Sequence, residues 1–204
     1  LQLPGVLSAS VEKKESYENG AVFRVEINHV PEYVFLLAWK TKDTTKLSGD
    51  GKKLLRKATE LVELAQQYTS AYEKVVFFHD YLVLNTKYDM LESDSVGQTA
   101  YGALVEGRCV CMGYTNAFYL LLSMAGIENE IVYGEAGGEA HAWNKVWIDD
   151  GWYHVDVTWD DPMPDEEGCV QHTYLNVTDE FMARTHIWKD DGTRPATQTK
   201  WNYV

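Results

Sequence analysis

Residues 110–122 read Val-Cys-Met-Gly-Tyr-Thr-Asn-Ala-Phe-Tyr-Leu-Leu-Leu and predict a helix that begins at a cysteine. Downstream of Cys111, apolar or small side chains recur at helical spacing, and Gly126 follows where a helix C-terminus favours glycine. Cys111 therefore falls in the first turn, where free N–H groups and the positive end of the helix dipole stabilise a thiolate. This position suits a nucleophile.

Two apolar runs that follow this helix carry an imidazole and a carboxylate. His141 opens the run 141–148, and Asp156 lies in the run 152–159, just past a turn signal at Asp150. Thiol, imidazole and carboxylate are the groups that cysteine-dependent acyl transfer uses. An ideal hairpin places residue 144 or 145 opposite Asp156, so a direct contact with His141 requires strand twist, a bulge or a bent strand.

Three separated segments resemble the core of bacterial members of the transglutaminase-like family. They are residues 107–114 (Gly-Arg-Cys-Val-Cys-Met-Gly-Tyr), 141–144 (His-Ala-Trp-Asn) and 152–161 (Trp-Tyr-His-Val-Asp-Val-Thr-Trp-Asp-Asp). The similarity extends over about residues 72–188. It implies an α+β, papain-like fold in which the nucleophile helix packs against an antiparallel sheet. It also implies a triad with Cys111 as nucleophile, His141 as base and Asp156 as the residue that orients the base.

Each member of this predicted triad also has a purely structural interpretation. Free cysteines are often buried, and a single histidine or aspartate is often a satisfied polar group. Cys109 is the alternative thiol. The family motif favours Cys111, and Cys109, in the segment that precedes the helix, is expected to have a packing role, with a redox partner as the less favoured alternative.

An acyl-transfer site also needs hydrogen-bond donors for the oxyanion of the tetrahedral intermediate. The backbone N–H of Cys111 is one natural donor, and by analogy with the family Gln98 or Tyr101 supplies a side-chain donor. Trp143 and Trp152 are expected as apolar walls around the histidine, although core packing explains both equally well.

The composition excludes several classes of protein. The chain has 204 residues, 26 of them Trp, Tyr or Phe, and a formal net charge of −13. Such a negative charge argues against binding to nucleic acid or to anionic membranes, and no apolar run reaches the length of a membrane span. The three cysteines cannot all pair, so a disulfide framework is not expected.

No cofactor or metal is expected from the sequence. The acidic stretch Asp160-Asp161 and Asp165-Glu166-Glu167 invites a calcium site, but prolines interrupt it and no EF-hand pattern is present. A solvated acidic loop is the favoured interpretation.

The remaining pattern predicts a strand-rich segment over residues 1–50 packed on a catalytic core over residues 51–204. Strands are expected over residues 6–40, with a turn at 18–20 and a buried strand at 33–39. The further expectations are helices at 52–67 and 70–84, a loop-rich segment at 89–107, a strand at 130–134 and a flexible link at 134–138.

The resemblance implies cysteine-dependent acyl transfer on a peptide or glutamine-type amide through a thioester. Hydrolysis is favoured over crosslinking. The alternative is a non-enzymatic protein- or cell-wall-binding module with the same fold. The expected partner is a protein or peptide substrate, and the oligomeric state stays open. The family suggests an extracellular or cell-surface location, and the first residue, Leu1, suggests a processed or trimmed chain.

Overall fold

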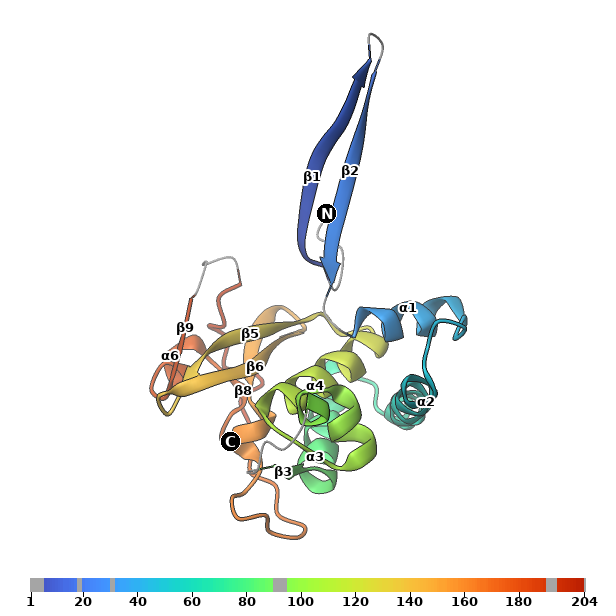
Figure 1. Cartoon of the computed structure of the whole chain (residues 1–204). Coiled ribbons are helices and arrows are strands. Elements are labelled where there is room, and N and C mark those ends of the chain that lie inside the picture. The colour runs from blue at the N-terminus through green and yellow to red at the C-terminus, as the bar shows by residue number, and fades with distance from the viewer. Residues whose placement is uncertain (1–5, 18–19, 30–31, 90–94, 190–193, 204) are drawn as a thin grey trace. The chain divides into compact units, whose positions relative to one another are not determined.

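The chain divides into two compact units, Leu1–Asp43 and Thr44–Val204 (Figure 1). The computed structural model describes residues 6–17, 20–29, 32–89, 95–189 and 194–203. The sequence predicts a boundary near residue 50, and the packing of the first segment on the core stays a prediction.

The first unit contains an antiparallel hairpin and a helix. The hairpin pairs β1 (Val6–Tyr17) with β2 (Gly20–His29), as the alternating sequence predicts, and two of the three predicted turn residues, 18 and 19, lie outside the described residues. The strand predicted at 33–39 is wrong, because Tyr33–Thr41 forms the helix α1. A short apolar run is compatible with either element, so its periodicity could not decide between them.

The first two α-helices of the second unit both begin at side-chain caps. Helix α2 (Gly49–Leu64) starts at Ser48, which accepts a hydrogen bond from the N–H of Gly51. Helix α3 (Ala71–Asn85) starts with a capping box formed by Ser70 and Glu73. Both predicted helices are confirmed, with the short 3₁₀ turn Ala65–Gln67 extending α2.

The sheet of the second unit is antiparallel and has the strand order β8-β7-β6-β5-β9. Its hairpins are built from β5 (Asn129–Ala136), β6 (Glu139–Ile148) and β7 (Gly151–Val155), and its edges are β8 (Leu175–Val177) and β9 (His186–Trp188). The flexible link predicted at 134–138 is wrong: β5 continues to Ala136, and Gly137 and Gly138 close a tight turn at φ +60° and +87°. A left-handed turn of this kind favours glycine at both positions.

Helix α4 (Cys111–Met124) is the buried centre of the second unit. It packs against β5 and β6 on the sheet and against α2 and α3 (Figure 1). Phe118, Leu120, Leu121 and Leu122 are fully buried, which explains the apolar run that first indicated this helix. The predicted α+β architecture, with the cysteine-bearing helix on an antiparallel sheet, is confirmed.

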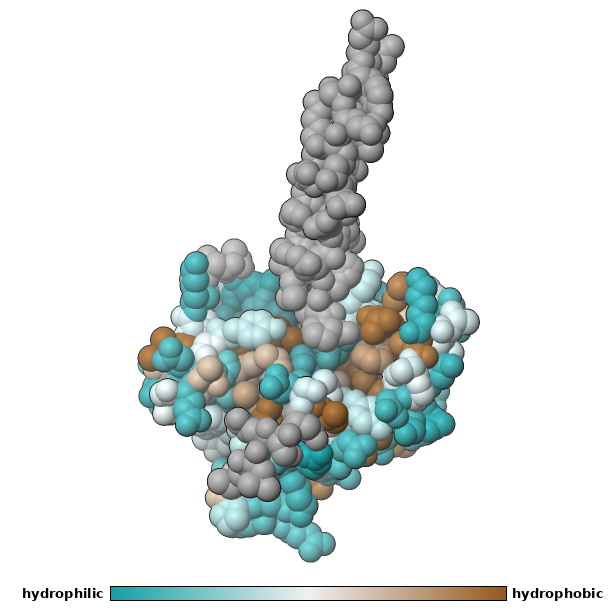
Figure 2. All heavy atoms as spheres, viewed as in Figure 1, coloured by the Kyte–Doolittle hydropathy of each residue, from teal (hydrophilic) through white to brown (hydrophobic). Residues whose placement is uncertain are grey.

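Short elements connect these larger ones. They are β3 (Lys87–Tyr88), the 3₁₀ turn Ser95–Gln98, the π-helical turn Gly102–Glu106, β4 (Arg108–Cys109), α5 (Val157–Asp160) and α6 (Asp179–Met182). Much of the visible face is hydrophilic, with hydrophobic residues in small groups, in keeping with the charged composition (Figure 2). Among the described residues, no helix is both long enough and apolar enough to cross a membrane.

Candidate active site

Cys111 begins α4, as the sequence predicts. The preceding residue, Val110, makes no side-chain cap, and its own N–H donates to the carbonyl oxygen of Gly97 at 3.0 Å. The thiol is partly exposed, and it lies on the wall of a cavity of about 500 Å³. Its placement combines the positive end of the helix dipole with access from solvent, two conditions that favour a reactive thiolate.

Hydrogen bonds between α4 and β6 fix the position of His141 relative to this thiol. Thr115 Oγ1 donates to the carbonyl oxygen of Ala142 at 2.8 Å, and Asn144 Nδ2 donates to the carbonyl oxygen of Thr115 at 3.2 Å. Both bonds are buried, and they are made by residues of β6 that follow His141. His141 lines the same cavity as Cys111, so the two side chains border one space.

Asp156 lies 2.7 Å from His141, measured from carboxylate Oδ2 to imidazole Nε2. The strand register explains how the contact arises. Asn144 on β6 pairs with Val155 on β7, so Asp156 directly follows the last residue of β7 that pairs with β6. Because the turn of this hairpin contains two residues, Asp156 lies one position closer to His141 than the sequence predicts. The chain then leaves the strand, because Asp156 caps α5 by accepting from the N–H of Trp159 at 3.1 Å. This bend turns the carboxylate toward the histidine.

The charge states of this pair follow from burial and from their partners. Burial alone would lower the pKa of His141, but hydrogen bonds with Asp156 and Cys111 outweigh it and raise the pKa to about 9. Burial would raise the pKa of Asp156, yet hydrogen bonds from His141 and His186 hold it below the usual range. At neutral pH the pair is therefore an imidazolium beside a carboxylate.

His186 is a third member of this cluster that sequence reasoning missed. Its Nε2 lies 2.9 Å from the same Asp156 oxygen, and its Nδ1 lies 2.8 Å from Thr185 Oγ1. His186 begins β9, which reaches the cluster by pairing with β5, where Ala136 faces it. No local motif marks this residue, since only a pairing between distant strands brings it to the carboxylate.

The two predicted tryptophans have different positions. Trp143 packs beside His141, with ring centroids 5.9 Å apart, and its Nε1–H donates to His154. Trp152 instead packs on Trp147 at the turn end of the hairpin, six residues from His141 along β6. Trp159, which the sequence analysis did not single out, lies 6.3 Å from the His141 ring and lines the cavity.

The two oxyanion candidates also differ. Gln98 is exposed, and its backbone carbonyl accepts from Asn116 Nδ2 on α4 at 3.0 Å. Gly113 lets this segment approach closely, because a Cβ there would lie 2.5 Å from the carbonyl oxygen of Gly97. The hydroxyl of Tyr101 instead donates to Asp50 on α2 at 3.3 Å.

Cys109 is fully buried in β4, in agreement with its predicted packing role, and burial raises the pKa of its thiol.

The expectation of a solvated acidic loop holds for residues 165–167, but it is wrong for Asp160 and Asp161. Both are buried: Asp160 accepts from the N–H of Tyr174, and Asp161 accepts from the hydroxyl of Tyr114. Burial raises the pKa of Asp161 to about 6, although the bond from Tyr114 opposes this.

His141, Asp156 and His186 also have the side-chain spacing of a metal site. The geometry disfavours one, because both Asp156 oxygens are already engaged and the three side chains are at most 8% exposed. A metal ion needs ligand atoms that can be freed and a path of entry. The arrangement fits acid–base chemistry on a thiol better.

Comparisons with solved structures give similar proteins at low sequence identity. A protein described as a TGase matches with 18% identity and a TM-score of 0.48 over 72% of this chain and 44% of its own length. A putative cysteine protease from Cytophaga hutchinsonii matches with 20% identity and a TM-score of 0.44, over 81% and 70% of the two chains. The periplasmic domain of TgpA from Pseudomonas aeruginosa matches with 19% identity and a TM-score of 0.43, over 68% and 54%.

The chain thus spans less than half the length of the first of these proteins. No curated protein matches it significantly in sequence. Residues 61–157 match the family model described as the transglutaminase-like superfamily, a segment that contains Cys111, His141 and Asp156. This match covers just under half of the chain, and it makes residues 61–157 similar to the transglutaminase-like superfamily.

Proposed function

We propose that the chain is an enzyme that transfers the acyl group of a peptide or glutamine-type amide to Cys111. One observation carries this proposal: Asp156 Oδ2 lies 2.7 Å from Nε2 of His141, and His141 and Cys111 line one cavity. Because Nε2 is engaged, Nδ1 is the ring nitrogen available to the thiol. This is the arrangement that activates a thiol nucleophile.

The first step is attack of the Cys111 thiolate on the amide carbonyl carbon, which gives a tetrahedral oxyanion. The backbone N–H of Cys111 and the side chain of Gln98 are the proposed donors to this oxyanion. The position of Gln98 beside the start of α4 supports it over Tyr101, whose hydroxyl is committed to Asp50.

Collapse of the intermediate breaks the C–N bond and leaves a thioester on Cys111. The imidazolium of His141 gives its proton to the departing amine, and the resulting neutral imidazole then takes a proton from the attacking acceptor. Asp156 keeps the ring oriented through both steps and stabilises its positive form. The carboxylate stays ionised throughout, because its pKa is held below the usual range.

Water is the proposed acceptor, which makes the overall reaction hydrolysis. The cavity wall includes the exposed residues Glu139, Met163 and Gln171, so solvent reaches the thioester. An amine acceptor would give crosslinking by the same first step. The extracellular or cell-surface location stays a prediction.

The test is mass spectrometry of a peptide mixture incubated with the full chain, with and without a fluorescent primary amine. Hydrolysis predicts new peptide termini or deamidated glutamines, and the amine is not incorporated. Incorporation of the amine would support transamidation instead. If the chain modified no peptide but bound peptides or cell-wall fragments equally well with Cys111→Ala, the non-enzymatic binding module would be the better account.

A further inference from the structure

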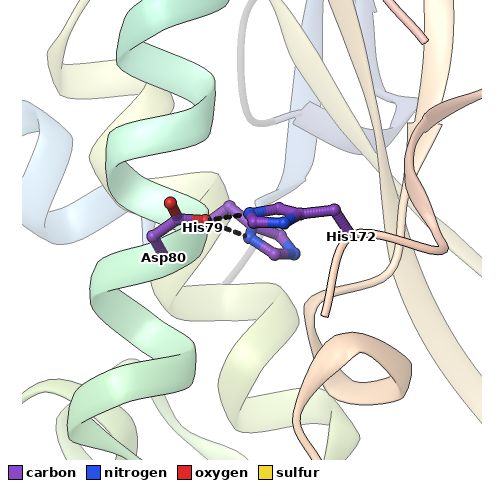
Figure 3. A group of neighbouring side chains, drawn as sticks. All are labelled: His79, Asp80 and His172. Carbon is purple, nitrogen blue, oxygen red and sulfur yellow. Dashed lines mark hydrogen bonds and ion pairs between the residues drawn. The ribbon is translucent and has the colours of Figure 1, made fainter. Parts of the chain in front are cut away.

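A second cluster of two histidines and one aspartate lies between α3 and the segment before β8 (Figure 3). His79 and Asp80 belong to α3, and His172 precedes β8. Asp80 Oδ1 lies 2.9 Å from His79 Nδ1 and 2.8 Å from His172 Nε2. Figure 3 shows both rings directed at this one oxygen, so three potential ligand atoms converge, all within 4.8 Å of one another.

A buried carboxylate orients the first of these histidines from its other side. His79 Nε2 lies 3.1 Å from Asp160 Oδ2, and both side chains are fully buried. The Asp160 carboxylate is itself fixed by the N–H of Tyr174 at 2.9 and 3.1 Å. Metal-binding histidines commonly donate their second ring N–H to a carboxylate, which fixes the tautomer and makes the ligating nitrogen more basic.

We propose that His79 Nδ1, His172 Nε2 and the Asp80 carboxylate bind a divalent first-row transition metal ion, for which zinc is the representative. Two imidazole ligands favour such an ion over calcium or magnesium, which take oxygen ligands. Ligand atoms around tetrahedral zinc lie about 3.3 Å apart, so the present spacing needs only small side-chain movements. The two carboxylates, Asp80 and Asp160, balance the charge of the ion.

This cluster differs from the one beside Cys111 in having a path of entry. The side chain of Asp80 is 32% exposed and that of His172 is 18% exposed. Asp80 also lines a cavity of about 460 Å³, together with Tyr203, whose ring stacks on His172 at 3.9 Å. A fourth ligand, such as water, can therefore reach the ion from this side.

The bound ion would link α3 to one wall of the active-site cavity. Gln171 lies on that wall, and its N–H donates to the carbonyl oxygen of Asp160 at 3.1 Å. His172 follows it directly in the chain. The site is thus structural, in that it stabilises residues 160–172 without taking part in the reaction at Cys111.

The test is calorimetric titration of the chelator-treated full chain with Zn²⁺, in the parent and in His172→Gln. The proposal predicts one ion per chain, at least about tenfold weaker binding in His172→Gln, and a zinc-dependent rise in the Tm that His172→Gln abolishes. The matched control is His186→Gln, which changes the cluster beside Cys111 and is expected to leave zinc affinity unchanged. Co²⁺ binding should give d–d absorption bands without a thiolate charge-transfer band.

Three results would overturn the proposal, besides an unchanged zinc affinity in folded His172→Gln. They are the absence of saturable binding in the parent, binding that is weakened by His186→Gln and not by His172→Gln, and a thiolate band in the Co²⁺ spectrum. Circular dichroism of each variant separates loss of the ligand from loss of the fold. If His172→Gln is folded and binds zinc as tightly as the parent, the cluster is a hydrogen-bonded network only.

Discussion

Two clusters in this domain have the same basic construction, one aspartate oxygen that contacts two histidine rings. In the first, Asp156 holds His141 and His186, and Cys111 lines the same cavity as His141. In the second, Asp80 holds His79 and His172, and His79 also contacts a second carboxylate, that of Asp160. The surroundings of each cluster, more than its three side chains, determine the chemistry that it supports.

The difference is one of charge and access. Beside Cys111, His141 contacts a single carboxylate and lines an open cavity, which suits the proton transfers that we propose for it. At His79, burial would lower the pKa, but two carboxylates outweigh it and raise the pKa. Two carboxylates around one imidazole favour a fixed positive charge or a bound cation.

The largest expected effect distinguishes Cys111 from the other thiols. Cys111→Ser should lower the rate of peptide hydrolysis by at least about 10⁵-fold, because a hydroxyl does not replace the thiolate at this site. The rate is measured on a peptide that the parent cleaves or deamidates. Cys169→Ser is the matched control, and an equal loss of activity in that variant would contradict the assignment.

Asp156→Asn should lower kcat by about 10³- to 10⁴-fold, because the neutral amide no longer orients His141 or stabilises its positive form. Asp149→Asn serves as the control, since Asp149 is an exposed carboxylate that binds Lys200 and Trp201. Steady-state kinetics of the two variants measure kcat for each and test this prediction. Unchanged kcat in folded Asp156→Asn would remove this carboxylate from the proposed mechanism.

The raised pKa of His141 predicts a loss of stability at alkaline pH. A raised pKa in the folded state gives stability that is complete below the unfolded pKa of about 6.5 and is lost as the pH rises through about 9. The free energy of unfolding should fall by up to about 3 kcal/mol over this interval. Urea unfolding across that interval measures it. His141→Asn should flatten the profile, and an equally steep fall in that variant would assign the loss to another group.

His186 is expected to have the smallest effect, as a positioning residue that acts through Asp156. His186→Phe should lower kcat about tenfold and shift the acid limb of the pH–rate profile upward, because one of the two bonds that lower the pKa of Asp156 is lost. His186→Asn retains a donor and should restore much of the rate. If both variants were equally slow with the same pH profile, the role of His186 would be packing alone.

The sequence predicted the parts of this site that depend on local structure. The spacing of apolar residues located α4 and placed Cys111 in its first turn, and the hairpin placed His141 on one strand and Asp156 directly after the next. It could not identify His186, because β9 reaches the carboxylate through pairing with β5, some 50 residues earlier in the chain.

Errors in the prediction came from contacts that are not local. Trp152 was expected beside His141, but it faces Trp147 across the hairpin, and Trp159 lies near His141 in its place. Asp160 and Asp161 were expected in solvent, because the sequence does not show that they form hydrogen bonds with the buried side chains of His79 and Tyr114.

The most direct test of the central claim is the rate of iodoacetamide labelling at each cysteine, followed by peptide mass spectrometry between about pH 4 and 9. If Cys111 and His141 form the reactive pair, Cys111 is labelled selectively below about pH 7, and His141→Ala slows this labelling while that of Cys169 is unchanged. If Cys111 reacts no faster than Cys169 in the parent, or if His141→Ala leaves its rate unchanged, the thiolate–imidazolium pair is absent and the enzymatic account is contradicted.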